Sequence, residues 1–305
     1  MSNYINQIKQ LLGESLLKSS DLNQVPSSRD NCVFIDNKNN QIIRVSISKS
    51  QQDVENEIEL LRYINEKGFP VPKIINRGTI YIDKASYPYI IFELFNHQIF
   101  KKINENQLEN AAYLLGKLHR ITKEYCDNNI YKQDRHLNQA LVQLYAKLIN
   151  TKNYATNKDS LIKDLEWGID FYNSQDFKKP QMVLHNDYRI NNVLFGKSRE
   201  IVAIIDFDWS LESPFALKDL GHSALEWSYP DGEKLNKKNF EKFINNYWLS
   251  DPPIKQVSLP EVWQWSKFSA LCDAAHYFLS FPEKTSNKFD SYMYDKYIYL
   301  KNNEA

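Results

Sequence analysis

Side chains suited to catalysis gather in the segment HNDYRINN, residues 185–192. Its candidate groups are His185, Asp187, Arg189, Asn191 and Asn192. The segment lies between two short apolar runs, Val183-Leu184 and Val193-Leu194-Phe195, which predict short buried strands. A polar group left unsatisfied beside a buried strand costs about 1–3 kcal/mol. The segment therefore predicts a site in which these groups are paired or bind a ligand.

A second acidic pair, Asp206 and Asp208, ends the next apolar run, REIVAIIDFD. If this run is a strand that pairs with residues 193–195 as a hairpin, Asn192 and Asp206 lie close together. An amide oxygen beside a carboxylate is suited to Mg²⁺. Asp187 would face the same space and would be free to accept a proton, which is the arrangement that phosphoryl transfer requires. For Asp208, a second metal ligand and a strand-end hydrogen bonder both remain open.

The elements that must position these groups fall into two parts. Up to about residue 95 we expect a helix over residues 4–19, a hairpin in CVFIDNKNNQIIRVSIS, a helix in DVENEIELLRYINEKG and a strand in YPYIIFELF. From residue 96 the helical period dominates, beginning with ENQLENAAYLLGKLHRITKEY. The sequence therefore predicts an α+β protein with two domains, residues 1–95 and residues 96–305.

Composition excludes several classes of protein. The chain of 305 residues has 38 Lys and Arg against 38 Asp and Glu, so no global charge attracts nucleic acid or an anionic membrane. No signal peptide or membrane-spanning run is visible, and we expect a cytoplasmic protein, either monomer or homodimer. The three cysteines are far apart, which argues against a disulfide scaffold or a zinc site.

Two motifs in the chain resemble those of a known family. HNDYRINNVLF followed by IIDFDWS is similar to the H-x-D-x-x-x-x-N and I-D-[FW]-[DE] signatures of the aminoglycoside phosphotransferase and choline kinase group. The resemblance covers about residues 25–280 in the family's order. It implies a two-lobed protein-kinase-like fold, with a small antiparallel sheet and one main helix in the N-terminal lobe and a larger, mainly helical C-terminal lobe.

The resemblance also implies a role for each residue of the two motifs. Asp187 corresponds to the catalytic base. Asn192 and Asp206 correspond to magnesium ligands, and Asp208 takes the acidic place two residues on. The implied cofactors are ATP or GTP and Mg²⁺.

Four further residues match supporting positions of the family. His185 matches the structural histidine of the catalytic loop, and Asp219 in FALKDLG matches the aspartate that orders this loop. Arg44 takes the strand position where the family has Lys or Arg on the nucleotide phosphates, and Glu57 matches the helix glutamate that pairs with it. An arginine keeps the charge of lysine but presents a planar fork.

The nucleotide-covering loop departs from the usual pattern because no glycine lies between Gly13 and Gly68. In its place VPSSRDNCVF offers Ser27, Ser28 and Asn31, whose hydroxyls, amide and backbone N–H groups suit phosphate oxygens. By resemblance, the adenine is expected near Glu93 and Phe95, in IIFELF. Asn186 stands where the family often has glycine.

The helices near the C-terminus carry acidic and aromatic residues that suit a small acceptor. We predict that Glu226, Trp227, Trp265 and Asp273 contribute to its pocket. Carboxylates and aromatic rings favour an amine, by charge pairing and by a cation–π attraction of about 0.5–2 kcal/mol per ring. The alternative is that these aromatic side chains belong to the helical core.

The predicted function is therefore a small-molecule kinase. It would move the γ-phosphate of ATP or GTP to a hydroxyl group of an aminoglycoside, an amino alcohol or a hydroxy amino acid. The first alternative is a catalytically silent kinase-like module that binds a ligand or partner. The second is a metal-dependent phosphohydrolase, which leaves Arg44 and Glu57 without a role.

Overall fold

The computed structural model describes residues 2–12, 22–25, 31–98, 100, 102–129, 131, 136–150, 158–229, 234–281 and 291–304. The chain divides into two compact units. The first, here called the sheet unit, comprises Met1–Phe100 and Val193–Asp208, and the second, the helical unit, comprises Lys101–Asn192 and Trp209–Ala305. The predicted division at residues 95 and 96 did not place the segment Val193–Asp208 with the N-terminal part.

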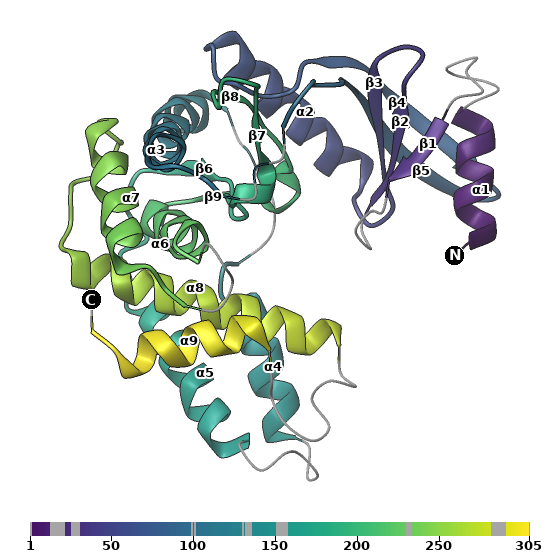
Figure 1. Cartoon of the computed structure of the whole chain (residues 1–305). Helices are drawn as coiled ribbons and strands as arrows, with labels where there is room; N and C mark the ends of the chain where they lie inside the picture. Colours follow the sequence, from purple (N-terminus) through teal and green to yellow (C-terminus); the bar gives the residue numbers. More distant parts are fainter. Residues whose placement is uncertain are drawn as a thin grey trace. The chain divides into compact units, whose positions relative to one another are not determined.

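The sheet unit is built on a five-stranded antiparallel sheet with the strand order β1-β2-β3-β5-β4 (Figure 1). The strands are β1 (Leu22–Val25), β2 (Asn31–Asp36), β3 (Gln41–Ser46), β4 (Ile74–Ile82) and β5 (Ala85–Glu93). β2 and β3 form the predicted hairpin, which is confirmed by a register that runs from Asn31 opposite Ser46 to Asp36 opposite Gln41. Its turn closes because the side chain of Asp36 accepts hydrogen bonds from the backbone and side chain of Asn39.

Helix α2 (Gln51–Glu66) begins at a capping box, in which Ser50 and Asp53 each accept a hydrogen bond from the other's backbone N–H. It ends before Gly68, which adopts the left-handed conformation that glycine tolerates best. The helix predicted in DVENEIELLRYINEKG is confirmed, and four apolar residues spaced three or four positions apart are all buried. They are Val54, Ile58, Leu61 and Ile64.

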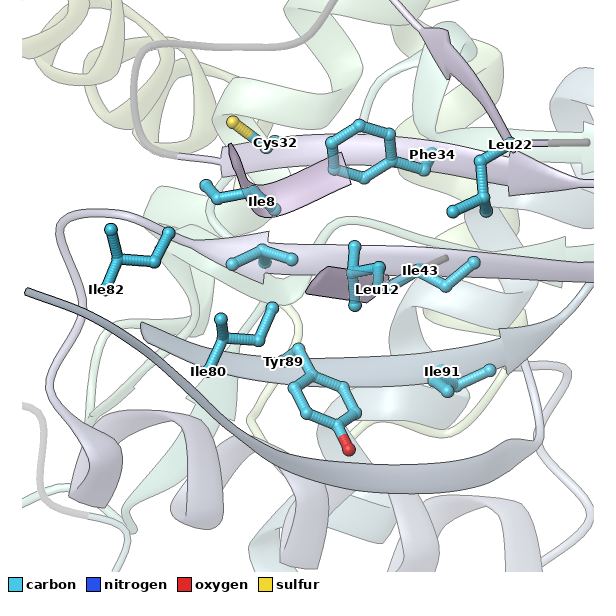
Figure 2. Close-up of a cluster of buried hydrophobic side chains, with 11 residues drawn as sticks. Ile8, Leu12, Leu22, Cys32, Phe34, Ile43, Ile80, Ile82, Tyr89 and Ile91 are labelled. Atoms are coloured by element: carbon cyan, nitrogen blue, oxygen red, sulfur yellow. The ribbon is translucent and has the colours of Figure 1, made fainter. Parts of the chain in front are cut away.

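Helix α1 (Ser2–Leu11) belongs to an apolar cluster of the sheet unit. Figure 2 shows Ile8 and Leu12 among side chains of the sheet, with Phe34 of β2 and Ile43 of β3 in the same cluster. The predicted helix over residues 4–19 extends beyond the described residues, since residues 13–21 lie outside them.

A second hairpin of the sheet unit comes from far along the chain. β7 (Val193–Phe195) pairs with β8 (Ile201–Ile204), with Val193 opposite Ile204, and the predicted hairpin is confirmed. The backbone N–H of Ile204 donates to the carbonyl of Pro70 at 2.8 Å, and that of Gln98 donates to Phe195 at 2.8 Å. These hydrogen bonds explain why Val193–Asp208 joins the sheet unit.

The helical unit consists of seven described helices and a short two-stranded sheet. Its elements are α3 (Glu105–Asn128), α4 (Gln139–Ile149), α5 (Lys158–Asn173), β6 (Met182–Leu184), β9 (Leu211–Ser213), α6 (Ala216–Trp227), α7 (Lys237–Leu249), α8 (Leu259–Ser280) and α9 (Tyr292–Asn302). The predicted strand Val183-Leu184 is part of β6, which pairs with β9. Thr122 of α3 donates a hydrogen bond to the carbonyl of Val183 at 3.0 Å and so connects α3 to this strand.

Close packing of α6 against α8 depends on Gly221. A Cβ atom at this position would lie 2.7 Å from the backbone nitrogen of Ser266 in α8, a distance that real Cβ atoms do not show. Ser266 also donates a hydrogen bond to the carbonyl of Gly221 at 2.9 Å. The glycine of the DLG motif therefore lets the two helices approach each other two residues after Asp219. No helix in the described ranges is both long and apolar enough to cross a membrane.

Candidate active site

Asp219 organises the loop that carries Asp187. It lies in the first turn of α6, is fully buried, and accepts hydrogen bonds from the backbone N–H groups of His185 at 2.8 Å and Asn186 at 2.9 Å. The ring of His119, on α3, lies 3.0 Å from the same carboxylate. Burial alone would raise the pKa of Asp219, but the hydrogen bond from His119 and nearby positive charges hold it well below its ordinary value. The loop is thus fixed to an ionised carboxylate.

Asn186 adopts a left-handed backbone conformation, with φ of 63°. Asparagine is one of the few residues other than glycine that visits this region readily, which explains its presence at a position where the family often has glycine. Its side chain accepts a hydrogen bond from Lys218 at 2.9 Å and donates one to the carbonyl of Trp209 at 3.0 Å. Both contacts hold the backbone on the N-terminal side of Asp187.

Asp187 and Asn192 contact each other directly. The side-chain amide of Asn192 donates to Oδ2 of Asp187 at 2.8 Å and to its backbone carbonyl at 2.8 Å. A single 3₁₀ turn, Ile190–Asn192, folds the chain back over the intervening residues, so the spacing of five brings the two side chains together. His185 is buried, and its Nδ1 accepts the backbone N–H of Asp187 at 3.3 Å.

The other oxygen of Asp187, Oδ1, faces two basic side chains. Nε of Arg189 lies 3.1 Å away and Nε2 of His222 lies 3.9 Å away. The side chain of Asp187 is 17% exposed and that of Arg189 is 40% exposed. One carboxylate oxygen is therefore fixed by Asn192, whereas the other has basic neighbours without a direct hydrogen bond in the described structure.

Two of the residues predicted for the acceptor pocket are core residues. Trp227 is fully buried, and its indole N–H donates to the carbonyl of Tyr188 at 3.1 Å. Trp265 is also buried, in an aromatic cluster with Phe171 at 5.0 Å and Phe215 at 5.3 Å between ring centroids. Their places in this structure favour the alternative of helical core over a pocket lining.

The two predicted acidic residues each have a cationic partner. Glu226 forms an ion pair with Lys296, whose ammonium also lies over the rings of Tyr292 at 4.1 Å and Tyr229 at 4.9 Å. Asp273 lies 3.2 Å from Nδ1 of His222. The ammonium group of Lys296 therefore already occupies the acidic and aromatic setting at Glu226 that was predicted to bind an amine.

In the sheet unit, four charged side chains form a buried network. Arg44 lies 2.8 Å from Glu57 and 2.8 Å from Asp208. Lys49 approaches the same two carboxylates, at 3.0 Å and 3.1 Å. Burial by itself would raise the pKa of Asp208, but Arg44 and Lys49 keep it below its ordinary value. Sequence reasoning paired Arg44 with Glu57 but missed Lys49, which lies outside the regular pattern of β3 and α2.

The predicted nucleotide residues occupy different settings. Asn31, on β2, donates to Asp208 and accepts a hydrogen bond from Ser46 at 3.1 Å, so it belongs to the buried charge network. Glu93 ends β5, where its carboxylate accepts the backbone N–H of Lys73 at 3.2 Å, and the carbonyl of Phe95 lies 3.1 Å from the ring of His97. Ser27 and Ser28 lie outside the described residues.

The two predicted metal ligands of the I-D-F-D motif differ in setting. Asp208 is buried and directs Oδ1 at two cations, an arrangement that favours a structural role over metal binding. Asp206 is half-buried and adopts a left-handed backbone conformation, with φ of 68°. Within the described ranges, no three His, Cys, Asp or Glu side chains form a cluster that could hold a metal by themselves. Magnesium bound together with nucleotide phosphates needs only one or two protein ligands, so such a cluster is not required.

The chain matches a known protein family over most of its length. A family model described as the phosphotransferase enzyme family matches residues 21–248. None of the curated protein sequences compared with the chain matches it significantly.

Solved structures show the same fold at low sequence identity. A choline/ethanolamine kinase family protein from Mesorhizobium loti aligns with a TM-score of 0.64 and 14% identity, over 97% of this chain and 93% of that one. The aminoglycoside phosphotransferase APH(3'')-Id from Streptomyces rimosus aligns with a TM-score of 0.62 and 12% identity, over 88% and 97%. A streptomycin–ATP–APH(2'')-IIa ternary complex aligns with a TM-score of 0.60 and 18% identity, over 97% and 96%. The α+β fold class and the resemblance inferred from the two motifs are confirmed.

Proposed function

The chain belongs to the phosphotransferase enzyme family and is a small-molecule kinase, and we propose that it transfers the γ-phosphate of ATP or GTP to a hydroxyl group of a small, amine-bearing molecule. The proposal depends above all on the contact between Asn192 and Asp187. It joins a candidate metal ligand to a candidate base, and it fixes one oxygen of the base, while the other faces the basic side chains of Arg189 and His222.

Asp187 is the proposed base. Its Oδ1 accepts the proton of the acceptor hydroxyl as the hydroxyl oxygen forms a bond to the γ-phosphorus. The bond from the γ-phosphorus to the bridging oxygen breaks, and the nucleoside diphosphate leaves with the electron pair. Asn192 and the buried Asp219 hold the loop so that Asp187 meets the acceptor without reorganisation.

Asn192 and Asp206 are the proposed magnesium ligands. The fit rests on the amide of Asn192, whose nitrogen is committed to Asp187. Its Oδ1 takes part in neither of these hydrogen bonds and is a hard oxygen donor of the kind that Mg²⁺ prefers. Asn192 directly precedes β7, and Asp206 follows β8 by two residues in the paired hairpin. When bound, the metal would neutralise charge on the transferred phosphate.

Arg44 and Lys49 are proposed to provide positive charge for the nucleotide phosphates. Glu57 and Asp208 hold both cations in place, because each carboxylate contacts both of them. Arg189 is an exposed cation beside Asp187, with its Nε 3.1 Å from Oδ1, and is proposed to meet the phosphate during transfer. The loop residues Ser27, Ser28 and Asn31, and the strand end at Glu93 and Phe95, keep their predicted nucleotide roles as proposals.

The acceptor class is proposed from what the structural relatives act on and from the charges near Asp187. The relatives are named for choline, ethanolamine and aminoglycosides, which all combine an amine or quaternary ammonium group with a hydroxyl. Asp273 is the more exposed of the two predicted acids, at 27% against 13% for Glu226. We therefore propose that Asp273 binds the amine of the acceptor, whereas Glu226 stays paired with Lys296.

The test measures ADP or GDP release by the purified protein with Mg²⁺ and a panel of acceptors. The panel contains choline, ethanolamine, streptomycin, homoserine and glucose, and ³¹P NMR identifies the phosphorylated product. Asp187→Asn keeps the size of the side chain but cannot accept the proton, so turnover should fall by about 10²–10⁴-fold while nucleotide binding is retained. The matched control is Asp251→Asn, a substitution of a side chain that is 97% exposed.

Three outcomes separate the functions. A product that is lost in Asp187→Asn but not in Asp251→Asn supports the kinase. Full activity of Asp187→Asn contradicts the assignment of the base. Nucleotide binding without diphosphate release from any acceptor would instead indicate the silent binding module.

A further inference from the structure

His222 is a buried histidine that the proposed reaction does not yet use. It lies on α6, is 5% exposed, and its Nδ1 is held by two groups of α8, Asp273 at 3.2 Å and the hydroxyl of Ser269 at 3.2 Å. Its Nε2 is buried and has no hydrogen-bond partner among the described residues. The nearest oxygen of the proposed base, Oδ1 of Asp187, lies 3.9 Å from it.

A distance of 3.9 Å is too long for a hydrogen bond but suits a bridge through one further atom. A hydroxyl oxygen at about 2.8 Å from each of the two atoms satisfies both of them. Without such a partner, a buried ring nitrogen remains unsatisfied, which is unfavourable and uncommon in folded proteins. Because Nδ1 is already held by α8, the ring cannot turn away to satisfy Nε2 elsewhere.

The charged groups that face the ring come from three elements. Asp187 lies on the catalytic loop, Asp273 on α8, and Lys218 and Glu226 on α6 itself. Burial alone would lower the pKa of His222, but the contact with Asp273 raises it above its ordinary value. A carboxylate faces each ring nitrogen, Asp273 at Nδ1 and Asp187 at Nε2, and a ring with a hydrogen on both nitrogens suits this setting. Nε2 is then a donor directed towards the proposed base.

We propose that His222 is an acceptor-binding residue, whose Nε2–H donates a hydrogen bond to the reacting hydroxyl oxygen between it and Asp187. This inference rests on the proposed function, and it adds a residue to the same site. Ser269 acts as a positioning residue, because it holds the ring through Nδ1, and Asp273 does so in addition to its proposed contact with the amine.

The proposed contact orients the nucleophile. A hydroxyl oxygen has four tetrahedral directions, of which one is the bond to carbon. Its proton points to Oδ1 of Asp187, and one lone pair accepts the hydrogen bond from His222. The remaining lone pair is then directed at the γ-phosphorus, so the proton moves to Asp187 as the new oxygen–phosphorus bond forms and the diphosphate leaves with the electron pair of the broken bond.

Arg189 occupies the space beside the same oxygen of Asp187 in the absence of substrate. It is the most exposed of the three side chains, and a long exposed side chain moves at small cost. Its movement towards the phosphate would open Oδ1 of Asp187 and Nε2 of His222 to the hydroxyl together.

The experiment compares His222→Asn and His222→Gln in the full-length chain. The amide of asparagine reproduces the Nδ1 position and keeps a contact to Asp273, but it provides nothing at Nε2. The longer glutamine places its amide nitrogen near the Nε2 position. The probes are choline, ethanolamine and streptomycin, with water as a further acceptor, and the measured quantities are acceptor KM, MgATP KM, kcat and Tm.

His222→Asn should lower kcat/KM for the acceptor by roughly tenfold or more, with an unchanged MgATP KM and Tm. His222→Gln should recover most of this loss. The proposal is overturned if His222→Asn matches the wild type, if both variants lose activity equally, or if the loss in His222→Asn comes with a lower Tm. Wild-type protein that forms no diphosphate with any probe, water included, refutes the proposed function and the inference that rests on it.

Discussion

Asp219→Asn tests whether a buried carboxylate holds the catalytic loop. Asp219 accepts two backbone N–H groups, from His185 and Asn186, and contacts the ring of His119. Asparagine has nearly the same shape, but it has one acceptor oxygen and adds an NH₂ donor. At least one of the three donors then faces another donor in a site without access to water.

The expected loss of stability follows from these contacts. One buried donor without an acceptor costs about 1–3 kcal/mol, and removal of one partner from a buried charged pair costs about 3–5 kcal/mol. Because asparagine keeps part of the hydrogen bonding, we expect the free energy of unfolding to fall by about 3–4 kcal/mol. This is a large share of the roughly 5–15 kcal/mol that stabilises a typical protein.

The assay is urea unfolding of the wild type, Asp219→Asn and the control Asp251→Asn, followed by tryptophan fluorescence. The control should lie within about 0.5 kcal/mol of the wild type, as exposed substitutions usually do. A loss below about 1 kcal/mol in Asp219→Asn would refute the argument, because it would mean that the carboxylate is not needed to satisfy the loop.

The same variant has a defined dependence on pH. Since the folded-state pKa of Asp219 is depressed, its stabilising contribution is fully present above the unfolded-state pKa of about 3.9. It is lost as the pH falls from that value towards the lower folded-state pKa. The difference in stability between the wild type and Asp219→Asn should therefore be constant from pH 7 to about pH 5 and should shrink below about pH 4.

Two further substitutions test the cation network and the loop backbone. Lys49→Met keeps the side-chain stem but leaves Arg44 as the only one of the two cations that contacts Glu57 and Asp208. The KM for MgATP should therefore rise severalfold, and the free energy of unfolding should fall by about 1–3 kcal/mol. Lys238→Met, at a side chain that is 78% exposed, is the control, and equal values for both variants would contradict the role of Lys49. Asn186→Ala should lose about 1–2 kcal/mol relative to Asn186→Gly, because φ is 63° at this position. Equal unfolding free energies for Ala and Gly would rule out backbone strain as the reason for the choice of residue.

The sequence predicted best those features that depend on local pattern. The buried face of α2, from Val54 to Ile64, and the hairpins β2–β3 and β7–β8 follow from spacing and from turn residues. The proximity of Asp187 and Asn192 was also predictable, because they lie only five positions apart and one short turn, Ile190–Asn192, brings them together.

Features that depend on contacts between distant segments could not be predicted. Trp265 belongs to α8, whose apolar residues occupy all sides of the helix, so its spacing cannot separate a core tryptophan from one that lines a pocket. Asp273, which holds the ring of His222, is far from it in the sequence and lies on a different helix. Lys49 follows β3 in an irregular segment, where no periodicity indicates that its ammonium reaches Glu57 and Asp208.

Helix α6 explains why the short stretch KDLGH carries so much of the site. Lys218 contacts the side chain of Asn186, Asp219 accepts the backbone of His185 and Asn186, and His222 faces Asp187 one turn later. Residues four apart lie on the same side of a helix, so Lys218 and His222 meet successive residues of the loop. Gly221 faces α8, where only a residue without a side chain permits the close packing that brings Asp273 and Ser269 to His222. A change at Gly221 should therefore reach Asp187 through the position of His222, and the loop and the helix behind it form one functional unit.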